Sequence, residues 1–431
     1  MISQSLAVQL VAFLGRAGEK FLSRLNLVRP RSTGGFRAAA AVFVVGTAAT
    51  LAACGPSGFG GGGFGAGPAV RASQPVTGEV LGSGSVRVAM LLPLSATGNA
   101  GQIATNFRNA AELALRDFKM AGIQVMIKDD QGTAEGARAA ASEAISQGAE
   151  LILGPLFARS VTAVGTVARG ANVPVIAFSS DTTAAAPGVY LLSFLPQSDV
   201  DRIVSFAASR GKRSFAALLP NNAYGSLVEA ELQRAVAGAG GRVMSSQRYD
   251  LDKTSMQTQA TSLATRVKSG GVDAVFLPDA GDAAPFLAQV LAANGVTADK
   301  ITYLGSGQWD NDQRVASESN LNGGWYPAPE NAGFGSFAKR YQAAYGAAPS
   351  RTASLAYDAT SLAAGLAGRF GDQRFSQQTL TNPNGFIGID GAFRFLANGF
   401  NQRGLAVYQI NRGMAQIIDP APRTFTGASG T

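Results

Sequence analysis

Residues 86–98 read VRVAMLLPLSATG. The first seven, Val86–Leu92, are almost all apolar, and a proline followed by small and hydroxyl-bearing residues closes the run. An apolar run of this length that ends in turn residues is typical of a strand buried on both faces. Residues 103–118 then repeat apolar side chains at helical spacing. The stretch therefore predicts a strand, a loop at its carboxyl end and a helix.

The same alternation continues along most of the chain. A first series predicts strands at 123–128, 151–153, 173–178 and 190–194, with helices at 133–147 and 158–169. A second series predicts strands at 214–219, 242–249, 274–277 and 301–304, with helices at 199–209, 224–239, 255–268 and 283–293. Strands that alternate with helices of this length form right-handed units around a parallel sheet. Two series in tandem predict an α/β fold with two lobes.

The pattern changes after Trp325. Two helices are expected near 337–345 and 355–370, and short strands at 391–395, 405–410 and 414–418. Elements that follow two complete series predict that the chain crosses back between the lobes. The expected limits are 86–198 plus 326–382 for the first lobe, 199–325 plus 383–418 for the second, and 419–431 as a flexible tail.

Composition limits the chemistry. The chain has no histidine and a single cysteine, which excludes Ser-His-Asp and Cys-His catalysis, an internal disulfide and a thiolate metal cluster. Neither a nucleophile elbow nor a phosphate-binding loop is present, and the adjacent acids Asp129 and Asp130 would point to opposite faces of a strand. We expect no enzyme activity, no cofactor and no metal.

The net charge of +8 is uneven, because residues 1–53 carry +5 and the remainder only +3. No basic stripe runs along the remainder, so no nucleic-acid partner is expected.

The amino-terminal region has the pattern of an export signal. Residues 38–53 (AAAAVFVVGTAATLAA) are apolar, and three arginines precede them. Sixteen residues fall short of the roughly 20 that span a bilayer, so residues 1–53 are interpreted as a signal peptide. The signal is complete without residues 1–27, and translation starting near Val28 is a further hypothesis.

The end of this signal, Leu51-Ala52-Ala53-Cys54, resembles the lipobox of bacterial lipoproteins. That resemblance implies an acylated Cys54 as the first residue of the mature chain; the alternative is a buried helix with an isolated cysteine. Residues 54–85 are rich in glycine, proline and serine and predict a tether that spans roughly 30 Å. The expected location is the periplasm, with the lipid in the inner or the outer membrane.

Several segments of the folded part, taken in order, resemble the type I periplasmic-binding superfamily, in particular its leucine/isoleucine/valine-binding group. They are residues 86–98, 337–349 (FAKRYQAAYGAAP), 356–359 (AYDA), 388–395 (GIDGAFRF) and 407–410 (VYQI). The resemblance implies a monomer whose two lobes close over a small ligand in the cleft between them. It also implies three crossovers, expected near 196–200, 322–328 and 380–386.

The loops after the strands of the first lobe are candidate ligand contacts, because open α/β sheets bind ligands at the carboxyl ends of their strands. Their candidate residues are Ser95, Thr97, Ala158, Arg159, Ser160, Ser179, Ser180 and Asp181. In the family the second of these loops holds a ligand carboxylate, and Arg159 is either a clamp for that anion or a solvated helix residue. Asp181 would repel a carboxylate but pair with an ammonium group; the alternative is a helix cap.

The second lobe offers Tyr224, Asp279 and Asp282 as candidate contacts. The family places an acid for the ligand's amino group after a later strand, where this chain reads Leu304-Gly305-Ser306-Gly307-Gln308-Trp309 without an acid. Asp279 or Asp282 are the expected substitutes, and Asp310 is the acid nearest to that segment.

Two functions fit these features. The first is a receptor that delivers an amino acid of branched-chain type, or a related small solute, to an ABC permease. The second follows from residues 154–156 (GPL), 173–179 (VPVIAFS) and 192–196 (LSFLP), which resemble penicillin-binding protein activators. Those are lipoproteins that stimulate a peptidoglycan synthase through protein contacts.

Overall fold

The computed structural model describes residues 74–117 and 122–425. The expected signal peptide, Cys54 and most of the tether lie outside the described residues, as do residues 426–431 of the expected tail. Among the described helices, none combines the length and the apolar character needed to cross a membrane.

The first sheet has the strand order β1-β3-β2-β4-β5-β6, with β1 antiparallel and all other neighbours parallel. Its strands are β1 (Val80–Leu81), β2 (Val86–Leu92), β3 (Ile123–Asp129), β4 (Leu151–Leu153), β5 (Val175–Ala177) and β6 (Val189–Leu191). The strand expected from residues 86–98 is confirmed as β2, next to the centre of this sheet.

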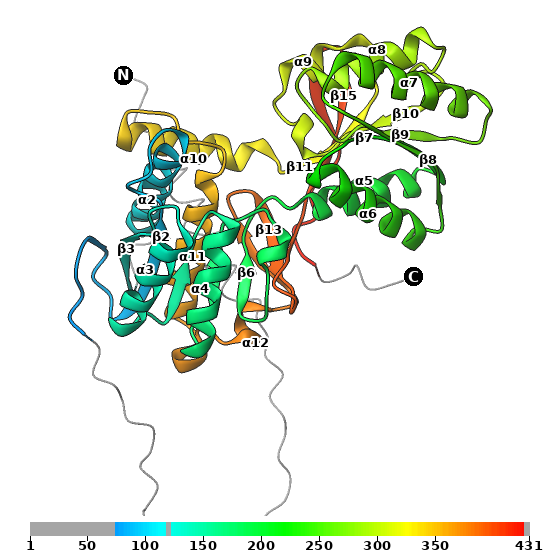
Figure 1. The fold of residues 1–431 in the computed structure, drawn as a ribbon. Coiled ribbons are helices and arrows are strands. Elements are labelled where there is room, and N and C mark those ends of the chain that lie inside the picture. The colour runs from blue at the N-terminus through cyan, green and yellow to red at the C-terminus, as the bar shows by residue number, and fades with distance from the viewer. Residues whose placement is uncertain (1–73, 118–121, 426–431) are drawn as a thin grey trace, which may run out of the picture. The chain divides into compact units, whose positions relative to one another are not determined.

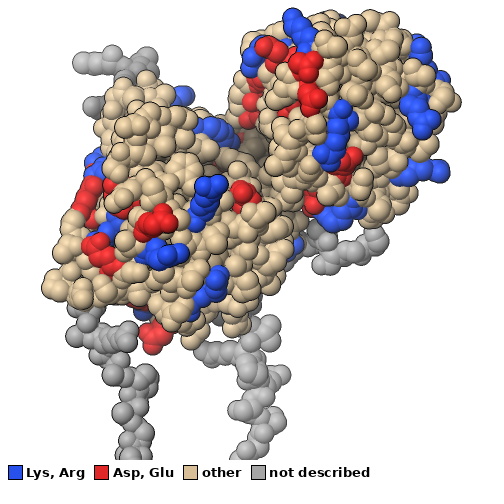
Figure 2. All heavy atoms as spheres, viewed as in Figure 1, with Lys and Arg blue, Asp and Glu red and all other residues tan. Residues whose placement is uncertain are grey.

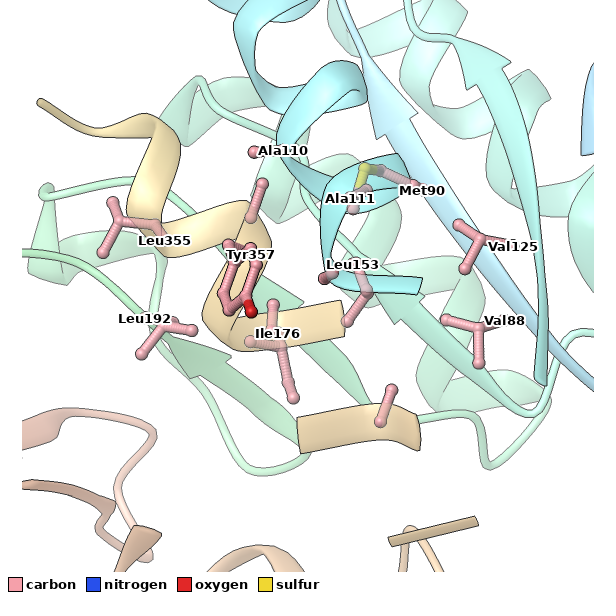
Figure 3. Packing of buried hydrophobic residues seen from close by; sticks show 14 of the residues in the cluster. Val88, Met90, Ala110, Ala111, Val125, Leu153, Ile176, Leu192, Leu355 and Tyr357 are labelled. Atoms are coloured by element: carbon pink, nitrogen blue, oxygen red, sulfur yellow. The ribbon is translucent and has the colours of Figure 1, made fainter. Parts of the chain in front are cut away.

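Helices cover both faces of the first sheet (Figure 1). They are α2 (Asn99–Asp117), α3 (Ala134–Ser146), α4 (Ala158–Gly170), α10 (Asn331–Tyr345), α11 (Ala353–Ala367) and the short α12 (Gln377–Leu380). Alternate residues of β2 point to opposite faces: Val88 and Met90 pack with α2 and α11 (Figure 3), whereas Ala89 and Leu91 pack with α3 and α4. Burial on both sides explains why β2 is apolar at every position except Arg87.

The second sheet has the order β16-β15-β11-β10-β9-β7-β8, parallel from β8 to β11 and antiparallel from there to β16. Its strands are β7 (Ser214–Pro220), β8 (Arg242–Tyr249), β9 (Ala274–Phe276), β10 (Thr302–Leu304), β11 (Trp325–Ala328), β15 (Ala406–Asn411) and β16 (Met414–Asp419). The helices of this lobe are α5 (Pro196–Ser209), α6 (Ala223–Gly238), α7 (Lys253–Lys268), α8 (Ala283–Ala293) and α9 (Gln313–Ser317). Helices α5 and α6 cover one face, and α7 and α8 the other. The predicted pair of parallel-rich α/β lobes is thus confirmed.

Two segments lie in a different lobe from the one expected. Strand β11 belongs to the second sheet, where it pairs with β10 and β15, although the first lobe was expected to resume at residue 326. A small antiparallel sheet of β12 (Phe386–Gly388), β13 (Gly391–Phe395) and β14 (Asn401–Arg403) packs Phe393 and Phe395 into the core of the first lobe, although residues from 383 onward were expected in the second.

Hydrogen bonds explain the place of the small sheet. The Asn401 Nδ2 and Arg403 Nε atoms of β14 both donate to the Ser193 carbonyl oxygen, at 2.8 and 3.0 Å. The last crossover therefore falls at 404–405, just before β15. Short apolar strands carry no sequence signal for the sheet they join, because either core would accept their side chains.

An ion pair in the first lobe holds this small sheet against α11. Asp390, which is 1% exposed, lies between β12 and β13, and its Oδ1 atom is 2.7 Å from the Arg351 Nη1 atom. The Ser354 hydroxyl donates to the other carboxylate oxygen at 2.6 Å. The Arg351 side chain is 29% exposed, so water partly compensates this cation when Asp390 is removed.

We therefore predict that Asp390→Ala lowers the free energy of unfolding by about 2 kcal/mol, because Arg351 and the buried Ser354 hydroxyl lose a charged acceptor. Urea denaturation measures the change. Asp372→Ala is the matched control, since the Asp372 carboxylate pairs with Arg374 while fully exposed, and the control should leave stability unchanged. Equal losses in the two variants would contradict the role of the Arg351–Asp390 pair.

Candidate functional site

Three loops of the first lobe lie at the carboxyl ends of β2, β4 and β5, which are neighbours in the sheet. Parallel strands end at a common edge, so these loops share one edge of the sheet. The first loop exposes Ser95 and Thr97, and the Ser95 backbone N–H donates to Asp129 Oδ1 at 3.3 Å. Both hydroxyls are therefore accessible at this edge.

The second loop leads into α4, whose amino terminus has no side-chain cap. Ala158 is the first residue of the helix and is half-buried. Arg159 is exposed and forms no hydrogen bond or ion pair with any described residue. A cation at the positive end of a helix is unfavourable by roughly 0.3–1 kcal/mol, and a bound anion would reverse that. Free N–H groups and an unpaired guanidinium together favour a carboxylate at this point.

Ser160 does not join Ala158 and Arg159 at the surface. Its side chain is fully buried, and its hydroxyl donates to the Thr133 carbonyl oxygen at 3.2 Å. This serine links α4 to the start of α3, so it positions the loop and presents no group to a ligand.

The third loop is occupied by a short 3₁₀ helix, η1 (Thr182–Ala184). Asp181 caps it by accepting hydrogen bonds from the Thr183 N–H at 3.0 Å and the Thr183 hydroxyl at 2.7 Å. Ser179 is buried and accepts from the Asp181 N–H at 3.1 Å, whereas Ser180 is exposed. The capping alternative for Asp181 is therefore what the structure shows, and Ser180 is the accessible hydroxyl of this loop.

In the second lobe the loops after β7, β9 and β10 meet at one edge. The Tyr224 hydroxyl, at the start of α6, donates to Ser306 Oγ at 3.1 Å, and Ser306 Oγ donates to the Pro278 carbonyl oxygen at 2.6 Å. Burial raises the pKa of Tyr224 above its usual range, so the hydroxyl stays neutral. These contacts join the three loops into one polar surface.

Asp279 belongs to this surface and Asp282 does not. The Asp279 carboxylate accepts a hydrogen bond from the buried Tyr249 hydroxyl at 2.5 Å, and burial raises its pKa. The Trp309 indole N–H donates to the Asp279 carbonyl oxygen at 2.9 Å. Asp282 is 92% exposed and lies 3.4 Å from Arg314.

The segment after β10 also borders a cavity of about 220 Å³. Its lining includes Trp309, Asp310, Tyr326 and Asn331. Burial raises the pKa of Asp310, and Arg351 of the first lobe opposes the shift. Asp310 is the acid nearest to the segment where the family places an acid for the ligand's amino group. Its negative charge is therefore already stabilised by Arg351.

The sequence interpretation missed Asp199. This residue lies in the first turn of α5, and its Oδ2 atom accepts a hydrogen bond from the Gly307 N–H at 2.9 Å. The helix thus brings an acid to the segment after β10 that has none of its own. The sequence did contain a signal that could have identified this residue. A proline followed by an acid in the next turn is typical of the start of a helix, and Pro196 and Asp199 form this pattern at the expected crossover.

On the face shown in Figure 2, acidic and basic side chains are interspersed. No patch of a single charge on this face therefore indicates a second binding site. Within 74–117 and 122–425, no group of three His, Cys, Asp or Glu residues has the arrangement of a metal site.

A comparison with protein families matches residues 85–415 to the family described as periplasmic binding protein. This match spans most of the chain, so the chain belongs to that family. Its members are binding proteins, and the chain is accordingly a solute-binding protein of the extracytoplasmic space and not an enzyme.

Solved structures agree with this fold. A candidate branched-chain amino acid ABC transporter from Rhodospirillum rubrum matches with a TM-score of 0.68 at 18% identity, covering 77% of this chain and 99% of its own. A branched-chain amino acid ABC transporter periplasmic ligand-binding protein from Burkholderia xenovorans gives 0.61 at 18%, covering 79% and 96%. A solute-binding protein from R. palustris in complex with benzoate gives 0.53 at 18%, covering 79% and 97%. A search of curated proteins finds no match.

We predict that Tyr249→Phe lowers the free energy of unfolding by about 2 kcal/mol, because Asp279 loses the donor that compensates its burial. Tyr303→Phe is the matched control. Its hydroxyl donates to the neutral Val296 carbonyl oxygen at 2.9 Å, and its loss should cost about 1 kcal/mol. Chemical denaturation of both variants measures the difference, and a larger loss in the control would contradict the assignment.

Proposed function

We propose that the protein is the receptor of an ABC importer and binds an amino acid, or a related small carboxylate, between its lobes. The observation that carries the proposal is Arg159, an unpaired cation beside the uncapped amino terminus of α4. Structural relatives assigned to branched-chain amino acid transport, and one with bound benzoate, support a carboxylate ligand. Within this class of ligands, we expect an amino acid of branched-chain type.

The roles of the loop residues follow from this proposal. Ser95, Thr97 and Ser180 would donate to ligand oxygens alongside the N–H groups of α4. Tyr224 and Asp279 would contact the ligand from the second lobe. Ser160 and Asp181 would act indirectly, by holding the loops that carry these groups.

We predict that Arg159→Gln weakens binding of a carboxylate ligand about 10–100-fold, the factor expected when one charged hydrogen bond is lost. Arg169→Gln, in the last turn of the same helix, is the matched control and should bind like the wild type. Calorimetric titration of the refolded chain with the twenty amino acids, benzoate and small peptidoglycan fragments provides the measurement.

The outcomes of this titration separate the candidate functions. A one-to-one response that Arg159→Gln abolishes supports the importer receptor. Silence of folded protein toward every amino acid and benzoate would overturn it in favour of a regulator of peptidoglycan synthesis.

We further propose that acylation of Cys54 anchors the mature chain to a membrane, with residues 54–85 as its tether. Incorporation of an alkyne-labelled fatty acid in a bacterial host should be complete in the wild type and absent in Cys54→Ser, because no other cysteine is present. Labelling that survives the substitution would contradict the anchor.

A further inference from the structure

The second lobe carries a group of cations at the edge of its sheet opposite to the candidate ligand loops. Helices α5, α6, α7 and α8 end at this edge, and strands β7, β8, β9 and β10 begin there. We call its six exposed cations the basic edge: Arg210, Arg213, Arg242, Arg266, Lys268 and Lys300. None of the six forms an ion pair with an acid in the described part of the chain.

The acids beside the basic edge do not neutralise it. In segments 206–214, 235–242, 264–274 and 290–302, the acids are Asp273 and Asp299. The Asp273 carboxylate accepts hydrogen bonds from the Arg213 and Ser214 backbone N–H groups at 2.8 and 2.9 Å, and from the Ser214 hydroxyl at 2.7 Å. The edge therefore holds an excess of positive charge, although residues 54–431 together carry only +3.

The other edge of the same lobe has the opposite charge. Segments 220–223, 250–253, 277–282 and 305–312, which follow the strands, contain the cation Lys253 and the acids Asp250, Asp252, Asp279, Asp282, Asp310 and Asp312. The helix dipole favours cations within the last turn of a helix, which accounts for Arg266 and Lys268 at the end of α7. It does not account for Arg213, just before β7, or for Arg242, the first residue of β8.

Two open grooves adjoin the basic edge. Arg210 borders one of about 410 Å³ together with the exposed Ser205, and its guanidinium lies 5.0 Å from the Phe206 ring without a hydrogen-bond acceptor in the described residues. Arg242 borders another of about 460 Å³ together with Met244, which is 43% exposed. A guanidinium beside a hydroxyl fits a phosphate group, and an exposed apolar side chain fits the boundary between headgroups and acyl chains.

We propose that the basic edge is a docking surface for an anionic phospholipid membrane. Each exposed cation held near such a surface strengthens binding about fivefold, and the six unpaired cations act together. The acids at the other edge of the lobe are repelled, so the lobe binds in one orientation with its ligand loops turned away from the lipid. This inference goes beyond the proposed function and does not require acylation of Cys54.

Cosedimentation with vesicles tests the proposal. The protein is the chain from residue 54, which contains every described residue, with Cys54→Ser so that no acyl chain contributes. The vesicles consist of phosphatidylcholine alone, or of phosphatidylcholine and phosphatidylglycerol in equal parts. At about 0.1 M salt we expect at least tenfold tighter binding to the anionic vesicles, and loss of this preference at about 1 M salt, where charges are screened within about 3 Å.

A variant with Arg242→Gln, Arg266→Gln and Lys268→Gln removes three of the six cations. Their side chains form no hydrogen bond or ion pair with described residues, so the fold should persist. Binding to anionic vesicles should weaken about 100-fold. The matched control removes the same charge from three exposed and unpaired residues of the first lobe: Arg138→Gln, Lys339→Gln and Arg369→Gln. The control should change binding less than threefold.

Every other outcome overturns the proposal. Absence of binding to anionic vesicles, equal binding to both kinds of vesicle, or wild-type binding by the triple variant would each do so. An equal loss in the control would show that net charge, and not the basic edge, attracts the protein. If circular dichroism shows that the triple variant is unfolded, the three single substitutions replace it, each with an expected loss of about fivefold. Solute binding is measured separately by the titration above, so either proposal can fail without the other.

Discussion

Burial of parallel strands on both faces is the constraint on which the rest of the structure depends. The central strands of both sheets expose no face to solvent, because helices cover them on each side. Polar groups that contact a solute therefore cannot lie on the strands and are restricted to the loops at their ends. The same constraint gathers these loops at a common edge of each sheet, which is why a binding site arises without any catalytic machinery.

The two edges differ in charge. The first carries the amino terminus of α4 with the unpaired Arg159, and the second carries carboxylates that include Asp199 and Asp279. In the proposed receptor the carboxylate of the ligand would lie at the cationic edge, whereas Asp279 at the other edge is compensated by the Tyr249 hydroxyl.

Much of the fold was predictable from local patterns, because β2 and its helix show the periodicities of a buried strand and an amphipathic helix. The lobe to which β12–β14 belong was not predictable, because Phe393 and Phe395 would fit the core of either lobe. Among the candidate site residues, Tyr224 and Arg159 could be proposed from the sequence because each lies in the first turn of the helix that follows a predicted strand. Asp199 was missed because a helix from another part of the chain brings it to Gly307, and Ser160 proved to be buried because its partner Thr133 lies in a different loop.

Hydrogen–deuterium exchange with and without an amino acid ligand tests the central claim most directly. Binding between the strand-end loops predicts slower exchange in residues 93–98 and 154–160 of the first lobe, and in residues 221–225, 278–281 and 305–310 of the second. Both sets should respond to the same ligand at the same concentration. Protection confined to one lobe, or located away from these loops, would contradict a ligand held between the two edges.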